Sequence, residues 1–248
     1  MDTFTPPPGY STGLIPRNYG KHPSGYLASA PSFPDELLIP ESEWASRLAA
    51  QQAAKSSLWD LREANYDTLR SLDQNGKGLC WAFSTVKAVM YLRAIMGEPA
   101  ARLSAWWVAG KIKNWRDEGG WGSASLAHIV SEGVPEESFC PSYRPPTNNE
   151  ACSENAKKHR VTEWWDGSES REQNRKIMVT CFLLGMPPVL DYNHMSHSMC
   201  GCRLVSVNPL VVDCDNSWGE GNNRGLLRLE GSKAIPDGLV IPRVTAAA

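Results

Sequence analysis

The order of hydrophobic and polar residues separates an irregular beginning from a periodic continuation. Residues 1–40 are rich in Pro, Gly, Ser and Tyr, as in TPPPGYSTGLIPRNYGKHPSGYLASAPSFP. A stretch of this composition buries too little apolar surface to fold alone, so the pattern predicts an arm outside the core. The following PESEWASRLAAQQAAK places Trp44 and Leu48 four residues apart, which predicts a helix.

Two later segments also have the periodicity of amphipathic helices. One begins at or near Cys80, in CWAFSTVKAVMYLRAI, and Gly97 and Pro99 follow it as end signals. The other is SASLAHIVSEG, with Ser123 as the expected N-cap and Gly133 as the expected C-cap. The apolar stripe of the first of these helices consists of Phe83, Val86, Met90 and Ala94.

The pattern changes after about residue 160. The stretches PPVLDY, HSMCGCRLVSV, PLVVDCDNSW and GLLRLEG are short apolar runs divided by Pro, Gly and Asn, which predicts strands and turns. A helical first half and a β-rich second half indicate an α+β protein of two packed lobes, with a site between them. We expect residues 1–55 to form the arm and its helix, and 56–248 the domain, with lobes at about 75–135 and 160–235.

Composition and charge restrict the range of partners. The chain has 248 residues, 42% of them hydrophobic, which is enough for a sizeable core. A formal net charge of −2 gives no support to a nucleic-acid or anionic-membrane partner. The first residues lack a basic and apolar signal pattern, and the apolar run VTCFLLGMPPVL is short and carries two prolines. We therefore expect a cytoplasmic protein, or one within a larger assembly such as a virion.

The seven cysteines indicate reactive chemistry more than a disulfide framework. An odd number leaves at least one thiol unpaired, and the spacing is irregular, which favours a reducing compartment. Cys140 and Cys152 could still form a bridge. Cys80 stands at the expected start of a helix, where the unpaired N–H groups carry roughly half a positive charge and favour a thiolate. Such a cysteine is either a nucleophile or an ordinary buried residue.

A nucleophilic cysteine needs a histidine as its base, and the β-rich half supplies two candidates. His197 begins the predicted strand HSMCGC, and His194 lies three residues earlier. An imidazole also needs a partner that fixes its tautomer, and Asn216 in DCDNSWGEG is suitable. Trp218 could shield that hydrogen bond from water. We favour His197 over His194.

The same segment offers a metal site as an alternative. HMSHSMCGC contains two His and two Cys at spacings found in zinc sites. On a strand, however, His197 would point away from Cys200 and Cys202, because successive side chains alternate between the two faces. We therefore expect no metal and no other cofactor.

In their order along the chain, these motifs resemble the papain family of cysteine peptidases. The resemblance rests on QNGKGLCWAFST, HSM and NSWGEGNNRGLLRL. LWDLREANYDTLRSLDQ is similar to the beginning of the mature enzymes, and EGGWGSASLAHIVSEGV to their Gly-Gly segment and the helix after it. The similarity extends over about residues 58–230. It implies a papain-like two-lobed fold with a helical N-terminal lobe and a β-barrel-like C-terminal lobe.

The resemblance also implies a role for each matched residue. Cys80 would be the nucleophile, His197 the general acid and base, and Asn216 the residue that orients His197. The Gln74 side-chain amide and the Cys80 backbone N–H would form the oxyanion hole. The implied reaction is hydrolysis of a peptide bond through a thioester acyl-enzyme. The substrate-binding positions that it implies are Gly119, Gly120, Trp81 and Trp218.

Several positions depart from the family pattern. Lys77 stands where a cysteine usually precedes the nucleophile, Asp117 lies near the place of its usual disulfide partner, and Lys111 replaces a further bridging cysteine. Ser196 replaces the more usual Asp or Asn before the histidine. The segment before His197 is short, so side-chain specificity cannot be transferred from the family.

Two functions of different classes remain open at this stage. The motifs predict a thiol hydrolase that acts on a peptide or protein substrate. The proline-rich arm instead suits a structural or assembly component, for example of a virion, built on a papain-like scaffold with or without residual activity. In an enzyme, the arm would contact a protein partner or lie in the chain's own cleft as a pro-segment.

Overall fold

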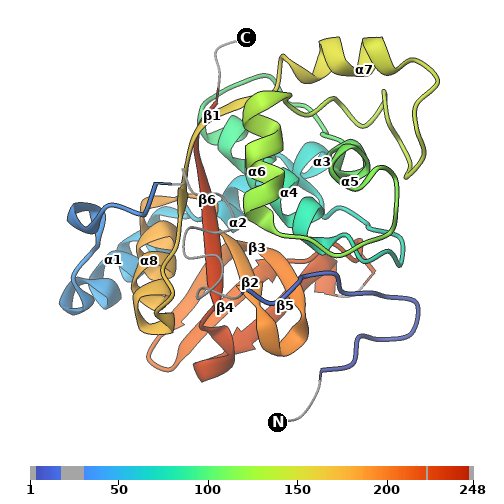
Figure 1. Ribbon diagram of the computed structural model, residues 1–248. Coiled ribbons are helices and arrows are strands. Elements are labelled where there is room, and N and C mark those ends of the chain that lie inside the picture. The colour runs from blue at the N-terminus through green and yellow to red at the C-terminus, as the bar shows by residue number, and fades with distance from the viewer. Residues whose placement is uncertain (1–3, 18–30, 222, 246–248) are drawn as a thin grey trace.

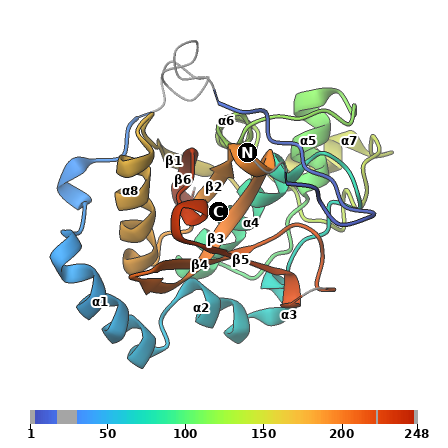
Figure 2. The same ribbon diagram turned by 90° about the horizontal axis from the view of Figure 1, so that it is seen from below.

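The computed structural model describes residues 4–17, 31–221 and 223–245. These residues form one β-sheet with helices on both of its sides (Figure 1). Seen from below, α1 and α8 lie on one side of the sheet, and α4, α5 and α6 on the other (Figure 2). The sheet and helices confirm the predicted α+β architecture of two lobes. No helix in the described ranges is long and apolar enough to cross a membrane. The α-helices are α1 (Glu41–Ala54), α2 (Leu58–Ala64), α3 (Tyr66–Leu69), α4 (Cys80–Ile95), α5 (Ala105–Lys113), α6 (Gly122–Ser131), α7 (Asn149–Ala156) and α8 (Arg171–Leu184).

The helical lobe is built around α4. Every residue of α4 from Cys80 to Arg93 is buried, because the helix passes between α5 and α6 on one side and the sheet on the other. A helix that is apolar nearly all round belongs inside a protein. Gly97, at φ +70°, turns the chain away just after the helix, as predicted. The buried helix α4 therefore fixes the position of Cys80, its first residue.

The other lobe is a six-stranded antiparallel sheet in the order β1-β6-β2-β3-β4-β5. β2 and β3 form a tight hairpin in which Tyr192 is opposite His197, and β3 continues beside β4, with Cys200 opposite Asp215. This register brings His197, at the start of β3, close to the end of β4, where Asn216 follows. The strands are β1 (Val161–Asp166), β2 (Val189–Tyr192), β3 (His197–Val207), β4 (Leu210–Asp215), β5 (Leu226–Glu230) and β6 (Gly238–Thr245).

Two local details differ from the sequence analysis. The N-cap of α6 is Trp121, which is still extended, and the helix begins at Gly122, so Ser123 lies inside the helix. Within the β-rich half, α8 is a helix of 14 residues that the strand pattern did not predict. Its end signals were present, however. The Ser170 side chain accepts from the Gln173 N–H, and Gly185 closes the helix at φ +71°.

The later part of the arm, residues 31–54, belongs to the core of the β-rich lobe, and we call it the anchor segment. Composition predicted that residues up to 40 lie outside the core, but Phe33 and Ile39 are buried. Phe33 meets the Trp165 ring edge-on at 5.1 Å, and Trp44 and Leu48 of α1 bury themselves against α8 and β3. The apolar residues of this segment are few, but each finds a site on the sheet.

A buried ionic cluster joins the end of β4 to the helical lobe. The Asp215 carboxylate lies 3.3 Å from Arg62 Nε and 3.1 Å from Lys87 Nζ, and accepts a hydrogen bond of 3.0 Å from the Tyr91 hydroxyl. Burial lowers the pKa of Lys87, while the adjacent carboxylate opposes that shift. A buried charge without its partners would be costly. The cluster thus fixes the strand end that carries Asn216.

Candidate active site

Cys80 lies at the head of α4 and is approached through a sharp turn. Asn75 and Gly76 have φ angles of +47° and +71°, in the left-handed region, and Leu79 is the N-cap residue at φ −118°. This path makes Cys80 the first residue of α4, at the end of the helix where the N–H groups lack intrahelical partners. The thiol therefore occupies the position at which the helix favours negative charge. Cys80 itself is fully buried.

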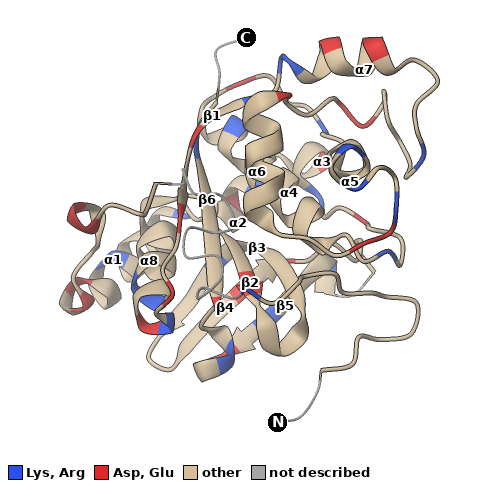
Figure 3. Ribbon diagram, in the orientation of Figure 1, with Lys and Arg blue, Asp and Glu red and all other residues tan. Residues whose placement is uncertain are grey.

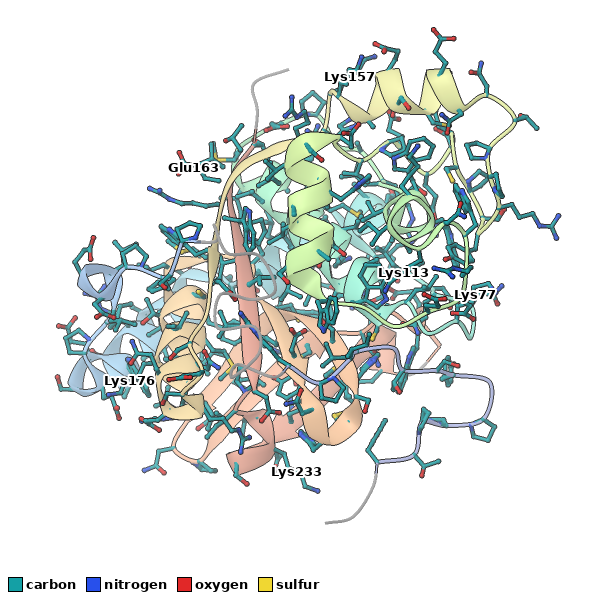
Figure 4. All side chains as sticks on the ribbon, in the orientation of Figure 1. Lys77, Lys113, Lys157, Glu163, Lys176 and Lys233 are labelled. Carbon is teal, nitrogen blue, oxygen red and sulfur yellow. The ribbon has the colours of Figure 1, made fainter. Side chains whose placement is uncertain are left out.

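The loop before Cys80 is held by a polar pair, Lys77 and Asp117, at two positions where the sequence departs from the family pattern of cysteines. Asp117 Oδ1 accepts from the Gly78 backbone N–H at 2.9 Å, and Asp117 Oδ2 lies 3.8 Å from Lys77 Nζ. Lys77 lies at the edge of the helical lobe, beside the N-terminal segment (Figure 4). Both groups are partly exposed, so the ion pair itself contributes little. The backbone hydrogen bond is the more specific contact.

His197 is held by Asn216 in one tautomer. His197 Nε2 lies 2.8 Å from Asn216 Oδ1. Because an amide oxygen can only accept, the proton is on Nε2, and Nδ1 keeps its lone pair. Nδ1 is buried and has no hydrogen-bond partner in the described parts of the chain. His194 is exposed, lies beside the Tyr192 ring and takes no part in this arrangement.

A hydroxyl pair joins the two elements that carry the cysteine and the histidine. Ser84 Oγ of α4 and Ser198 Oγ of β3 are 2.9 Å apart. Ser198 follows His197 directly, and Ser84 is one turn after Cys80. The Ser198 backbone also acts to lower the pKa of the Cys80 thiol. The head of α4 and the beginning of β3 are therefore close neighbours.

The Gln74 side chain is oriented by a serine that the sequence analysis did not single out. Ser217 Oγ donates to Gln74 Oε1 at 2.6 Å, which leaves the Nε2 group facing the cysteine loop. Nε2 donates to the Lys77 carbonyl and, at 2.9 Å, to the Ser11 carbonyl. The amide expected in an oxyanion hole thus already binds a peptide carbonyl. Ser217 lies between Asn216 and Trp218 in the NSW motif, so the motif contained the signal for this residue.

The Gly119–Gly120 segment forms a wall with no room for side chains on either face. A Cβ atom on Gly119 would lie 2.7 Å from the Gly13 carbonyl oxygen, and one on Gly120 would lie 2.6 Å from the Trp81 ring. Trp81 is fully buried, and its Nε1 group donates to the Glu118 carbonyl at 3.3 Å. Trp81, expected among substrate-binding residues, therefore supports the wall from behind. The backbone of Gly120 faces the cleft.

Trp218 covers His197 and continues into an aromatic stack. Its ring lies 4.9 Å from the His197 ring at an interplanar angle of 30°, and 5.0 Å from the Tyr10 ring at 23°. Phe4 adds a third ring at 6.4 Å from Trp218. Trp218 Nε1 donates to the Ser11 carbonyl at 3.2 Å. Trp218 thus shields the imidazole on one face and holds the N-terminal segment on the other.

Residues 4–17, which we call the cleft segment, lie across the site between the helical lobe and the sheet (Figure 1). The segment has no charged residue before Arg17 (Figure 3). The Gly13 backbone N–H donates to Cys80 Sγ at 3.2 Å, and the Leu14 N–H donates to the Ser196 carbonyl at 2.9 Å. The predicted arm therefore lies in the chain's own cleft. His22, in the same arm, is outside the described residues.

The cleft segment forms a parallel bridge with the glycine wall. The Gly120 N–H donates to the Gly13 carbonyl at 2.9 Å, and the Ile15 N–H donates to the Gly120 carbonyl at 3.2 Å. The fit is close, because a Cβ atom on Gly13 would lie 1.8 Å from the Gly78 carbonyl oxygen. Only glycine can occupy position 13 without displacing the backbone of the cysteine loop.

Burial beneath the cleft segment sets the protonation of the pair. Burial raises the pKa of the Cys80 thiol to about 12, against smaller opposing effects from backbone hydrogen bonds. Burial also lowers the pKa of His197 to about 4, although the Asn216 hydrogen bond favours the imidazolium. The covered site consequently holds a neutral thiol and a neutral imidazole near neutral pH.

The other cysteines lie apart from this site. All seven are free and buried among the described residues, including Cys140 and Cys152. Cys200 and Cys202 belong to the core facing the helical lobe, where the Cys202 thiol donates to the Asp213 carbonyl. No group of three His, Cys, Asp or Glu side chains in the described ranges could hold a metal ion.

Comparisons with known proteins bear on the family and on the fold. The family model of papain family cysteine proteases matches residues 56–190. Xylellain, a cysteine protease from Xylella fastidiosa, has a TM-score of 0.66 at 14% identity, over 98% of this chain and 100% of its own. A procathepsin B from Trypanosoma congolense has a TM-score of 0.62 at 16% identity, covering 96% and 87%. The bromelain protease from Ananas comosus has a TM-score of 0.59 at 19% identity, covering 73% and 96%. A search of curated protein sequences finds no match.

The fold and the motifs define a papain-like protein with a cysteine at the head of its central helix. Because the family model matches more than half of its residues, the chain belongs to the papain family of cysteine proteases. The solved structures, all at low identity, agree on the two-lobed fold. The roles of the individual side chains remain predictions.

Proposed function

We propose that the chain is a cysteine peptidase whose cleft segment blocks its own active site until that segment is displaced. The observation that carries this proposal is the pair of contacts made by the cleft segment. A backbone N–H of Gly13 caps the Cys80 sulfur, and the Ser11 carbonyl accepts from the Gln74 amide. The segment thus engages the groups that the reaction would need.

With the cleft open, the residues would act in two chemical steps. His197 Nδ1 takes the proton of Cys80, and the thiolate attacks the carbonyl carbon of the peptide bond. The Gln74 amide and the Cys80 N–H stabilise the oxyanion, after which the imidazolium protonates the departing amine. Water, deprotonated by His197, then hydrolyses the thioester and restores the thiol. Asn216 keeps the imidazole in the required tautomer throughout.

The cleft segment is suited to blocking and not to being cut. At Cys80 it presents the hydrogen of an amide, where a substrate must present a carbonyl carbon. It also desolvates the thiol and the imidazole, which favours their neutral forms over the ion pair. A thiol that stays protonated is a poor nucleophile.

Opening the cleft by substitution tests the proposal. In the full chain, Gly13→Ala places a methyl group against the Gly78 carbonyl and should unseat the cleft segment. We expect this variant to hydrolyse an unfolded protein substrate at least about 100-fold faster than the unsubstituted chain. Adding Cys80→Ala should abolish that hydrolysis. Thr5→Ala, on an exposed residue of the same segment, serves as the matched control and should change nothing.

The alternative function predicts a different result. A structural or assembly component on this scaffold would show no Cys80-dependent hydrolysis even when its cleft is open. Hydrolysis that persists in the Gly13→Ala, Cys80→Ala chain would also contradict the proposal. Labelling of Cys80 by a thiol reagent would verify that the cleft is open in the variant, so that lack of hydrolysis has a single meaning.

A further inference from the structure

An acidic corner lies beside the cleft, at the junction of three strands. Asp166 ends β1 and Asp191 lies in β2, and both residues are buried, at 3% and 5% exposed. Asp191 is opposite Ser198 in the β2–β3 ladder, and Ser198 follows His197. The Ser198 hydroxyl in turn contacts Ser84 of α4, the helix that begins at Cys80. The Asp191 side of the corner therefore adjoins the strand and the helix that carry the candidate site.

A basic side chain of the cleft segment occupies this corner. Arg17 Nη1 donates to Asp166 Oδ1 at 2.8 Å, and Arg17 Nη2 donates to the second oxygen of the same carboxylate. Both side chains are only 4% exposed. Arg17 is four residues beyond Gly13, which contacts Cys80, and two beyond Ile15, which pairs with Gly120. A peptide lying in the cleft can thus deliver a guanidinium to Asp166.

Asp191 leaves part of the corner unsatisfied. Its Oδ1 atom is buried and has no hydrogen-bond partner among residues 4–17, 31–221 and 223–245. Burial raises the pKa of Asp191 to about 7, whereas the hydrogen bond with Ser198 and the charge of Arg17 act against that shift. A buried acceptor of this kind is costly unless a donor or a cation reaches it. Beyond the Asp166 carboxylate that Arg17 binds, the corner therefore offers a second acceptor, Asp191 Oδ1, to a cationic donor.

We infer that Asp166 and Asp191 form a substrate subsite for a basic side chain, with arginine preferred over lysine, and that Arg17 occupies it in the blocked chain. This inference rests on the proposed peptidase function. When Arg17 leaves, two buried carboxylates face the cleft without their cation, so a substrate with a neutral side chain there leaves them unpaired. Arginine is favoured because its planar fork matches a carboxylate through two parallel hydrogen bonds.

Peptide hydrolysis by the full chain with Gly13→Ala and Arg17→Ala tests the inference, since these changes free both the cleft and the corner. Matched peptides would carry Arg, Lys or Leu at each position around the cleaved bond in turn. We expect one position at which Arg exceeds Leu in kcat/KM by about 10- to 100-fold, with Lys between them. Asp166→Asn and Asp191→Asn should each reduce that ratio about tenfold.

The matched control is Glu163→Gln on the same strand as Asp166. Glu163 is exposed and pairs with Arg243 on the outside of the sheet, so its removal should leave the Arg-to-Leu ratio unchanged (Figure 4). An equal rate for Arg and Leu peptides at every position would overturn the subsite and leave Asp166 as a latch for Arg17 alone. The subsite would also be rejected if Asp166→Asn and Asp191→Asn both kept the full preference for Arg over Leu.

The two proposals can fail separately. If the open chain cleaves no peptide, the peptidase function is wrong, and binding then decides the subsite. The same Arg and Leu peptides would be titrated calorimetrically onto the chain that also carries Cys80→Ala. Binding of the Arg peptide at least about tenfold tighter, lost in Asp166→Asn, supports the subsite. Equal binding of the two peptides overturns it.

Discussion

The two described parts of the N-terminal arm are held by different forces. The anchor segment buries Phe33, Ile39, Trp44 and Leu48 in the core of the β-rich lobe. The cleft segment buries one aliphatic side chain, Leu14, and otherwise depends on backbone hydrogen bonds, one aromatic stack on Trp218 and the ion pair of Arg17. Apolar burial contributes about 1.5–3 kcal/mol for each large side chain, whereas a net hydrogen bond contributes about 1 kcal/mol. The first segment is core, and the second is a bound peptide.

This difference indicates which part can move. A segment held mostly by hydrogen bonds exchanges them for water at small net cost, so it can leave while the rest of the protein stays folded. The anchor segment would hold the displaced residues near the cleft at a high effective concentration. Release of the cleft segment would then be reversible, and a peptide substrate would compete with it. The predictions below test this division of the arm.

The largest expected effect is on the reactivity of Cys80. The pKa of the thiol is raised to about 12 by burial, so almost no thiolate is present near neutral pH in the blocked chain. In the Gly13→Ala chain, water returns, the thiol pKa falls toward about 8.5 or below, and alkylation by iodoacetamide near neutral pH should be about 1000-fold faster. The His197 pKa, now about 4, should rise at the same time.

Rates measured as a function of pH check this prediction. In the unsubstituted chain, Cys80 labelling should increase only toward strongly alkaline pH, because the thiolate forms only there. In the Gly13→Ala chain, labelling should extend into the mildly acidic range as an ion pair with His197 forms. The remaining buried cysteines are internal standards, found by mass-spectrometric mapping. If Cys80 were labelled equally fast in both chains, the segment would not control the thiol.

The sequence indicates the side chains of the candidate site more directly than the backbone that covers it. Gln74, Cys80, His197 and Asn216 stand out because their chemistry depends on side-chain identity at fixed spacing. The cleft segment is bound through backbone N–H and carbonyl groups, which nearly every residue supplies. Its position is therefore not recognisable in the sequence, apart from the requirement for glycine at position 13.

Other features were hidden because they require contacts between distant segments. Ser217 is recognisable as the residue that orients Gln74 only once β4 lies beside the cysteine loop. Asp166 and Asp191 are 25 positions apart in the numbering, and only β6, which pairs with both their strands, brings them to one part of the sheet. Helix α8 was missed because its apolar run resembles the strands around it, while its caps at Ser170 and Gly185 were not used. Long-range packing decided each case.

A smaller effect is expected from truncating the anchor segment. Leu48 is 5% exposed and belongs to the same apolar cluster as Phe182 of α8, so Leu48→Ala should lower the free energy of unfolding by about 3 kcal/mol. Urea unfolding of the full chain measures this change. Arg47→Ala, one residue earlier and half exposed, is the control and should stay within about 0.5 kcal/mol. A cost for Leu48→Ala no larger than for Arg47→Ala would remove the distinction between the two segments.

The smallest effect should come from the aromatic stack. The Tyr10 ring lies 5.0 Å from Trp218, nearly parallel, and is partly exposed. Such a pair contributes about 1 kcal/mol, so Tyr10→Ala should raise the rate of Cys80 alkylation about fivefold and leave the free energy of unfolding nearly unchanged. Tyr10→Phe keeps the ring and should preserve the slow rate. Loss of folding stability in Tyr10→Ala, comparable with that of Leu48→Ala, would mean that the cleft segment is part of the core after all. A faster alkylation without that loss would identify it as a bound peptide that the fold can release.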